Sequence, residues 1–259
     1  MTAEFTGDVA DYYSRYRRGY PDAVVSSLAD ALELDLADVL VDLGCGTGQL
    51  TVPLSRRVRQ TIGVDPERDM LRHAGVAADR AGIHNIEWVS GSVEKLDSIV
   101  ARYGPLGAIT LANAIHLVDR TQLFKAARAA LKPGRGLAIV ANGTPLWLQP
   151  TAWSQSLRAF LEGWLHTNLT SCCGTDDETR LQYRTEVTEM GYRVSEIRTD
   201  YTDTLTLEHV VGGVYSAMGS RLPTRNERPA FEGRLADALA DSAPYVEHVS
   251  VRSLVARVQ

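Results

Sequence analysis

Cysteine is scarce in this sequence, and cysteine and histidine form no metal-binding pattern. Of the 259 residues three are cysteines, namely Cys45, Cys172 and Cys173. The last two are neighbours in the chain, which is too close for an unstrained disulfide, and no Cys/His spacing suggests zinc. We therefore predict three free thiols, as is usual in a reducing compartment, and no metal site.

The chain also lacks an excess of basic residues, a long apolar run and a leader segment. Its formal net charge of −5 argues against nucleic acid or an anionic membrane as the main partner. No run approaches the ~20 apolar residues of a membrane span. The first residues, MTAEFTGDVADYY, have neither the basic head nor the apolar stretch of a secretory signal. We therefore expect a cytoplasmic protein.

Repeats and low-complexity linkers are absent as well, so nothing in the sequence marks a domain boundary. With 44% hydrophobic and 23% charged residues the composition is that of a globular protein. Chains of this length commonly fold as one α/β domain. We expect a single domain over residues 1–259.

What the sequence does contain is a strand followed by closely spaced glycines, VLVDLGCGTGQL, at residues 39–50. An apolar run that stops in glycine is typical of a buried parallel strand entering a tight turn, here with Gly44, Gly46 and Gly48. Glycine permits positive φ and lets a ligand approach bare backbone. A dinucleotide fingerprint would need glycine at Gln49, and no Gly-Lys-Ser/Thr of a P-loop follows.

Alternating and helical apolar patterns continue to the end of the chain. They predict strands at 39–43, 60–65, 86–92, 107–114, 137–143, 193–204 and 246–258. They predict helices at 21–34, 49–58, 66–81, 119–131, 176–190, 205–219 and 226–240. In the helix at 119–131, Asp119 and Gln122 are spaced for N-terminal capping.

The acidic-x-Gly-x-Gly-x-Gly pattern that begins at Asp42 resembles motif I of the class I S-adenosylmethionine-dependent methyltransferases. The order of elements from about residue 24 to 258, with LKPGRG before the fifth strand, is similar to that family too. The resemblance implies a Rossmann-like, doubly wound α/β sheet of seven strands, parallel except for the last, with helices on both faces. It also implies S-adenosylmethionine as cofactor and S-adenosylhomocysteine as product.

The resemblance assigns cofactor contacts to the ends of the first four strands. Asp42 is expected to bind the ammonium of the cofactor, directly or through water. Asp65, at the tip of the second strand, is expected to accept hydrogen bonds from both ribose hydroxyls. The alternative is that Asp65 caps the next helix. Ser92 stands where the family has an aspartate beside adenine, and Met70 is expected to cover the ring unless it is plain core. The predicted cofactor residues in this part of the chain are Asp42, Gly44, Cys45, Gly46, Gly48, Asp65, Pro66, Met70, Ser92, Val93 and Asn113.

The fourth strand ends in NAIHLVD, which the resemblance places opposite the methyl group. His116 is a titratable group at this position and is the candidate general base; the alternative is a neutral histidine hydrogen-bonded in a loop. The tip lacks the Pro-Pro-aromatic sequence of nucleic-acid amino-methyltransferases, so that class of substrate is not expected.

Two further regions are predicted to lie on the substrate side. Residues 5–20 resemble the Tyr-x-x-x-Tyr-Arg-x-Gly-Tyr-Pro start of family members that act on small molecules. Tyr12 and Tyr16 are therefore predicted to form a lid over the cofactor. The alternative is an N-terminal helix that packs its aromatic rings on the domain. Segments 144–175 and 205–240 are predicted helical insertions. They supply the candidate acceptor-pocket residues Trp147, Trp153, Trp164 and Tyr215.

The sequence thus predicts methyl transfer to an O, N or C nucleophile of a small, partly apolar molecule, without nucleic acid or membrane as partner. The alternative is a cofactor-binding member of the fold that does not transfer methyl groups, such as a cyclase or a non-catalytic partner subunit. RNA or protein modification is a weaker possibility, because it calls for a basic groove or an added domain.

Overall fold

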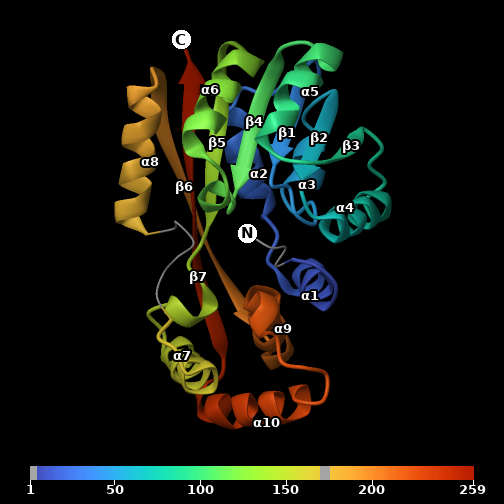
Figure 1. Cartoon of the computed structure of the whole chain (residues 1–259). Coiled ribbons are helices and arrows are strands. Elements are labelled where there is room, and N and C mark those ends of the chain that lie inside the picture. The colour runs from blue at the N-terminus through green and yellow to red at the C-terminus, as the bar shows by residue number, and fades with distance from the viewer. Residues whose placement is uncertain (1–4, 170–175) are drawn as a thin grey trace. The chain divides into compact units, whose positions relative to one another are not determined.

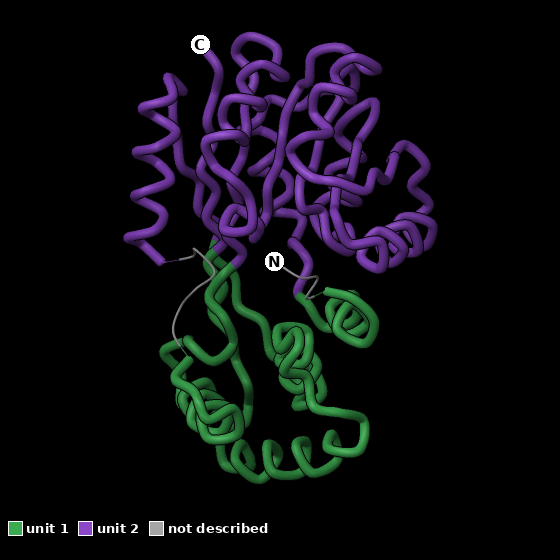
Figure 2. Tube along the Cα trace, viewed as in Figure 1, with its two compact units in different colours: residues 1–17, 143–172, 200–250 green, residues 18–142, 173–199, 251–259 purple. Residues whose placement is uncertain are grey.

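The computed structural model describes residues 5–169 and 176–259. The chain divides into two compact units, shown in different colours in Figure 2. Unit 1 comprises residues 1–17, 143–172 and 200–250, and unit 2 comprises residues 18–142, 173–199 and 251–259. The expectation of one domain over residues 1–259, with a lid and two insertions, stays a prediction.

Unit 2 is built on a twisted sheet with the strand order β3-β2-β1-β4-β5-β7-β6 (Figure 1). The strands are β1 Val39–Leu43, β2 Gln60–Asp65, β3 Ile86–Ser90, β4 Leu106–Ala112, β5 Leu131–Asn142, β6 Tyr192–Leu205 and β7 Tyr245–Val258. All neighbours are parallel except those of β7, which is antiparallel to β5 and β6. Residues 200–205 of β6 and 245–250 of β7 belong to unit 1. The predicted fold class is confirmed.

Helices surround this sheet in unit 2. They are α2 Asp22–Ala31, α3 Thr51–Ser55, α4 Arg68–Arg80, α5 Leu96–Tyr103, α6 Arg120–Ala130 and α8 Asp177–Glu189, with short 3-10 turns η1 Val93–Lys95 and η2 Ile115–Leu117. The predicted cap of α6 is confirmed, since the Asp119 carboxylate accepts a hydrogen bond from the Gln122 N–H at 3.0 Å. The strand order reverses between β1 and β4, and in open α/β sheets ligands bind beyond the carboxyl ends of the strands at that point.

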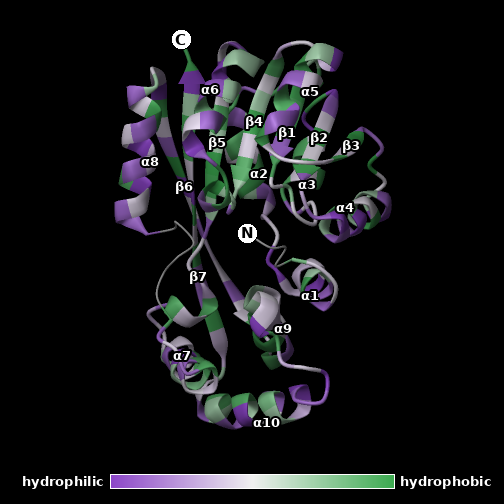
Figure 3. Cartoon of the chain, in the orientation of Figure 1, coloured by the Kyte–Doolittle hydropathy of each residue, from purple (hydrophilic) through white to green (hydrophobic). Residues whose placement is uncertain are grey.

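The core of unit 2 lies where the strands are apolar on both faces. All five residues of β1 are buried, and α4 buries Met70, Ala74 and Ala78, which share one face of the helix. Figure 3 shows the same division, with apolar residues concentrated on the central strands and polar ones on the outer helices. Burying one leucine of such a strand contributes roughly 1.5–3 kcal/mol. The sheet is therefore a stiff support for the loops at its edge.

Helix α5 was not predicted, and two other elements differ most from their predicted limits. The helix expected over 49–58 is a single turn, α3, because the N–H groups of Arg57 and Val58 bond carbonyls three residues back and so close it. The KPGRG segment, expected as a turn, lies within β5. There the ladder with β4 shifts register, so Leu131 pairs with Leu106 while Gly136 pairs with Ala108. The additional residues of β5 form a bulge, which accommodates the turn-forming sequence.

Unit 1 is mainly helical. Its helices are α1 Asp8–Tyr16, α7 Ala152–Leu165, α9 Leu207–Met218 and α10 Arg228–Leu239, with 3-10 turns η3 Leu146–Leu148, η4 Gly219–Arg221 and η5 Ala240–Ser242. Its core joins Leu157 of α7, Val214 of α9 and Phe231 of α10. Among the described residues no helix has both the length and the apolar character needed to cross a membrane.

Candidate functional site

The glycine loop follows β1 and is held in a conformation that side chains disfavour. Gly44, Gly46 and Gly48 have φ of 63°, 56° and 83°, values that glycine adopts without strain. A Cβ at Gly44 would also lie 2.7 Å from the Cβ of Ala114, closer than carbon atoms approach. The loop therefore needs glycine for its own backbone, and it presents peptide groups rather than side chains at the end of β1.

Asp65 ends β2 and is directed into this loop. It is 7% exposed; its Oδ2 accepts a hydrogen bond from the Gly46 N–H and its Oδ1 from the Glu67 N–H, both at 2.9 Å. Burial raises the pKa of this carboxyl, and the two backbone hydrogen bonds oppose that rise. Helix α4 begins at Arg68 with Glu67 as its N-cap, and Glu67 forms no side-chain cap bond. Asp65 lies two residues before that position and bonds the Glu67 N–H, so its role in capping stays a prediction.

Asp42 lies within β1, one residue before its end, and is 1% exposed. Its carboxylate accepts hydrogen bonds from the hydroxyls of Thr51 at 2.5 Å and Thr110 at 2.7 Å. Burial raises the pKa of Asp42 to about 6, the two hydroxyls lower it, and the charge of Asp65 raises it further. Asp42 thus links β1 to α3 and β4 beneath the loop, and near neutral pH it is a buried anion.

Two buried polar side-chain atoms of the loop have no hydrogen-bond partner among the described residues. They are the Thr47 hydroxyl and the Gln49 amide nitrogen. Buried polar groups are normally paired, because an unpaired one loses its bond to water without replacement. The Gln49 nitrogen can only donate a hydrogen bond, whereas the Thr47 hydroxyl can donate or accept one. A polar ligand with hydroxyl and carboxylate oxygens would satisfy both of them. The residues present therefore fit the polar parts of S-adenosylmethionine.

The tips of β4 and β5 meet through two asparagines. Asn113 has a φ of 52°, which is uncommon for a side-chain-bearing residue and is found at functional sites. Its Oδ1 accepts a hydrogen bond from the Asn142 N–H at 2.9 Å. Asn142, which the sequence analysis missed, is 7% exposed and donates to the Gly19 carbonyl at 3.3 Å. Its own Oδ1 has no partner among the described residues.

Comparison with known proteins agrees with this geometry. Residues 40–134, from β1 to the turn within β5, match the family model of a methyltransferase domain. A putative type II methyltransferase from Anaeromyxobacter dehalogenans has the same fold, with a TM-score of 0.59 over 94% of this chain and 98% of that chain, at 17% identity. Residues 40–134 thus resemble a methyltransferase domain, and the chain has the Rossmann-like methyltransferase fold.

Relatives found by sequence are matched over part of their length. A ubiquinone biosynthesis O-methyltransferase of Bradyrhizobium diazoefficiens is 34% identical over 108 residues, which are 42% of this chain and 41% of that protein. An uncharacterized RNA methyltransferase of Nostoc sp. is 40% identical over 75 residues, 29% of this chain and 16% of that one. The chain therefore spans less than half the length of either relative, and the predicted absence of a nucleic-acid partner stays a prediction.

The other predicted cofactor residues in unit 2 surround the same strand ends. Met70 and Val93 are buried, Ser92 donates its N–H to Glu94 at 2.9 Å, and Pro66 is exposed after β2. Cys45 is a buried free thiol whose pKa is raised by burial, so it is unreactive. Cys172 and Cys173 lie outside the described residues. No group of metal-binding side chains occurs in the described part of the chain.

His116 lies on η2, three residues after Asn113, and is exposed. Desolvation by the surrounding protein lowers the pKa of its imidazole below the ordinary value. The ring is therefore neutral at neutral pH and able to accept a proton. No described residue forms a hydrogen bond with it, so the alternative of a histidine hydrogen-bonded in a loop has no support.

The predicted site residues of unit 1 are held within that unit. Tyr12 packs edge-on against Tyr215 with ring centroids 4.9 Å apart, and the Tyr16 hydroxyl donates to Glu208 at 2.6 Å. Trp153 is 3% exposed and donates to the Val246 carbonyl, while Trp147 and Trp164 are partly buried against the same core. Roles for these residues in cofactor or acceptor binding stay predictions.

Proposed function

We propose that this protein transfers the methyl group of S-adenosylmethionine to an oxygen, nitrogen or carbon nucleophile of a small, partly apolar molecule. The observation that carries the proposal is the Asp65 carboxylate bonded to the Gly46 N–H, at 2.9 Å, inside a glycine loop. It joins a charged acceptor to backbone that a ligand can approach. The matched methyltransferase domain over residues 40–134 supports the same activity.

The chain's own groups suit the parts of this cofactor. Each Asp65 oxygen accepts one backbone N–H and keeps a second lone pair, so the pair can accept both ribose hydroxyls. Asp42 supplies negative charge for the ammonium, directly or through water. Met70, Ser92 and Val93 would lie against adenine. When bound, the cofactor supplies an electrophilic sulfonium methyl group, so the work left to the protein is alignment and exclusion of water.

A proton acceptor is needed only if the nucleophile must lose a proton during transfer. His116 is the candidate, since its lowered pKa keeps it neutral and its element follows the tip of β4. Asn113, with its side-chain oxygen bonded to Asn142, is expected to fix the shape of the tip rather than to move a proton.

A small acceptor is favoured over RNA by charge. The formal net charge is −5, and proteins whose main partner is nucleic acid carry a basic surface. The O-methyltransferase relative is named for ubiquinone biosynthesis, which supports a small, partly apolar acceptor. The RNA methyltransferase relative is matched over 29% of this chain, and RNA is therefore included in the test below.

The test is transfer of labelled methyl from S-adenosylmethionine to a panel of phenols, amines, carboxylic acids and a structured RNA. We expect product with at least one small-molecule class and none with RNA. Asp65→Ala should lose activity through cofactor binding, while the matched control Asp69→Ala, a partly exposed acid on α4, should keep it. Cofactor binding without turnover on any acceptor would favour the alternative of a non-transferring member of the fold.

A further inference from the structure

The tip of β5 contains a buried hydrogen-bond acceptor to which no described residue donates. It is the side-chain oxygen Oδ1 of Asn142, the last residue of β5, which is 7% exposed. The other polar groups of Asn142 are paired. Its N–H donates to Asn113 Oδ1 at 2.9 Å and its Nδ2 to the Gly19 carbonyl at 3.3 Å, while its carbonyl accepts from Arg18 at 3.3 Å. Asn142 is therefore held in place with one acceptor atom left over.

The orientation of the Asn142 amide is determined by its neighbours. Nδ2 faces the Gly19 carbonyl, and exchanging the amide nitrogen and oxygen would set two acceptor oxygens against each other. Oδ1 is therefore the atom without a partner among the described residues. An amide oxygen accepts hydrogen bonds and cannot donate one, so only a group that carries an O–H or N–H can satisfy it.

The position of this oxygen in the fold distinguishes it from another buried atom without a partner in the described chain. The Thr61 hydroxyl is also buried and unpaired, but Thr61 is the second residue of β2 and lies toward the amino ends of the parallel strands. Asn142 lies at the carboxyl ends, beyond which ligands bind in open α/β sheets. The tip of β5 is therefore at the edge of the sheet that a ligand approaches.

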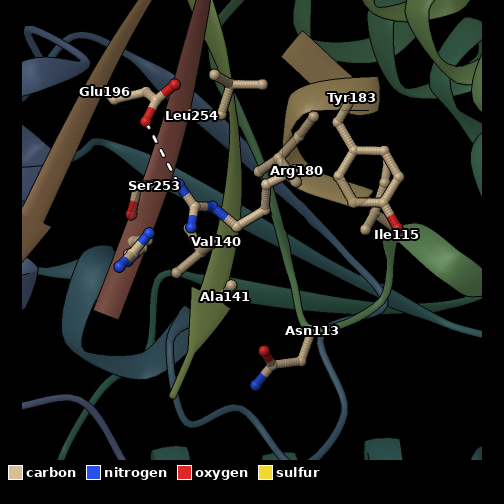
Figure 4. Close-up of a pocket in the computed structure, with 11 residues that line it drawn as sticks. Asn113, Ile115, Val140, Ala141, Arg180, Tyr183, Glu196, Ser253 and Leu254 are labelled. Atoms are coloured by element: carbon tan, nitrogen blue, oxygen red, sulfur yellow. Dashed lines mark ion pairs between the residues drawn. The ribbon is translucent and has the colours of Figure 1, made fainter. Parts of the chain in front are cut away.

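A cavity between α8 and the sheet adjoins the same strand tips (Figure 4). Its two arginines, Arg180 and Arg252, are already paired with carboxylates. Ala141 lines this cavity and Asn142 does not, because successive side chains of a strand point to opposite faces of the sheet. The unpaired oxygen therefore belongs to the other face of the sheet, on which Asn142 bonds Gly19.

The strand order indicates which ligand would reach Asn142. The strands run in the order β2-β1-β4-β5, so the tip of β4 lies between the glycine loop and the tip of β5. Neighbouring strands are about 4.8 Å apart, which places the tip of β5 roughly 15 Å from the tip of β2. Asp65 at the tip of β2 is proposed to hold the ribose, and the methyl group is expected at the tip of β4. A ligand group at Asn142 is then part of the methyl acceptor rather than of the cofactor.

We propose that Asn142 Oδ1 accepts a hydrogen bond from the nucleophile of the methyl acceptor, which is then an alcohol, phenol or amine with an O–H or N–H at the reacting atom. This bond leaves a lone pair of the same atom free to face the methyl group. Asn142 takes up no proton, because an amide is not basic, and His116 stays the candidate for that role. The inference rests on the proposed function and narrows it, since a carbon nucleophile carries no such donor.

Calorimetric titration with matched probes tests the inference. The pairs are 3-ethylphenol with 3-ethylanisole and 3-ethylaniline with 3-ethyl-N,N-dimethylaniline, each added to the full chain with and without saturating S-adenosylhomocysteine. S-adenosylhomocysteine lacks the transferred methyl group, which leaves room for the methyl groups of the second probe in each pair. The O–H or N–H probe of at least one pair should bind roughly three- to tenfold more tightly, as expected for one hydrogen bond. Equal affinity within both pairs, or no binding of any probe, would overturn the proposal.

Variants separate the acceptor role of Oδ1 from the structural bond to Gly19. Asn142→Leu removes both and should abolish the preference for the donor probe. Asn142→Asp loses the donor to Gly19 but keeps acceptor oxygens, so it should retain the preference. The matched control Thr61→Val removes an unpaired buried hydroxyl at the other end of the strands and should bind every probe as the parent does. Circular dichroism checks each fold.

Two results with these variants would contradict the assignment. One is a preference that survives Asn142→Leu in folded protein. The other is equal loss of the preference in Asn142→Leu and Asn142→Asp, which would show that Asn142 acts only through its bond to Gly19.

Failure of this inference is distinguishable from failure of the proposed function, because binding of S-adenosylhomocysteine is measured separately on the same samples. If it binds and no donor preference is found, the role of Asn142 is wrong while the proposed methyl transfer stands. If it does not bind, but Asn142→Leu abolishes a donor preference, Asn142 stands as a ligand contact and the proposed reaction is wrong.

Discussion

Lowering the pH from 7 to 5 is expected to weaken binding of S-adenosylhomocysteine about tenfold, because Asp42 takes up a proton over this range. Its burial raises the pKa to about 6. If the anion is what attracts the ligand's ammonium, the apparent affinity scales with the ionised fraction, which is about 0.9 at pH 7 and about 0.1 at pH 5. The ammonium and carboxylate of the ligand have ordinary pKa values outside this range.

Asp42 also leads to a prediction for the stability of the free protein. The free energy of unfolding should decrease as the pH rises, whereas the affinity for the ligand should increase. The pKa of Asp42 is raised on folding, so between pH 4 and 6 the folded chain holds a proton that the unfolded chain has lost. The free energy of unfolding should therefore fall as the pH rises from 4 to 6, by about 3 kcal/mol at most for a shift from 3.8 to about 6. Asparagine cannot ionise, so the Asp42→Asn variant should lose this decrease in stability, while Asp65, whose pKa is also raised, keeps its own contribution.

Calorimetry at pH 5, 6 and 7 in buffers of different ionisation enthalpy measures both the affinity and the protons exchanged. At pH 6 the parent should release about half a proton on binding, since Asp42 is half protonated there. Asp42→Asn should bind weakly, with less dependence on pH and little proton release. An affinity that is constant from pH 5 to 7 in the parent, without proton release, would show that Asp42 only braces the loop through Thr51 and Thr110.

Three further outcomes are expected. Asp65→Ala should weaken S-adenosylhomocysteine binding by roughly 1.5–3 kcal/mol per lost charged hydrogen bond, and an affinity within twofold of the parent would remove Asp65 from the site. Gly46→Val should abolish binding, and circular dichroism should show that the fold is retained. The control Gly134→Val, at a glycine with a φ of 78° and no neighbouring atom within 4 Å, should bind normally. Normal binding by Gly46→Val would mean that the loop has only a structural role. Hydrogen exchange of the amides in α1 should become slower when the ligand binds. In the free protein, Gly212→Ala should make this exchange faster, because the added Cβ would lie 2.2 Å from the Tyr16 ring. An exchange rate that the ligand does not change would contradict the predicted lid.

The parts of the site that sequence could predict are those encoded within a few residues. The glycines after β1 and the aspartate that ends β2 are local signals, because a tight turn needs glycine and the last residue of a strand borders the loop that follows. The seven-stranded sheet with an antiparallel last strand was implied by the resemblance to class I methyltransferases. The length of α3 was not predicted, since its closing hydrogen bonds depend on how residues 56–58 turn toward β2.

Contacts between distant segments were missed for a different reason. Thr110 bonds to Asp42 across 68 residues, Asn142 to Asn113 across 29, and Arg252 reaches the cavity through the register of β7. A one-residue shift in that register would place Arg252 on the other face of the sheet. Such partners have no periodic signal in the chain, because their positions are set by strand pairing.

The most direct test of the central claim is a calorimetric comparison of S-adenosylhomocysteine with NAD on the unmodified protein at pH 7. S-adenosylhomocysteine should bind with one-to-one stoichiometry and stabilise the protein against heat by about 2.7 kcal/mol at a ligand concentration of 100 Kd. NAD should do neither, since Gln49 replaces the glycine that a dinucleotide requires. Binding of NAD in preference to S-adenosylhomocysteine, or of neither, would contradict the assignment of the glycine loop and Asp65 as a cofactor site.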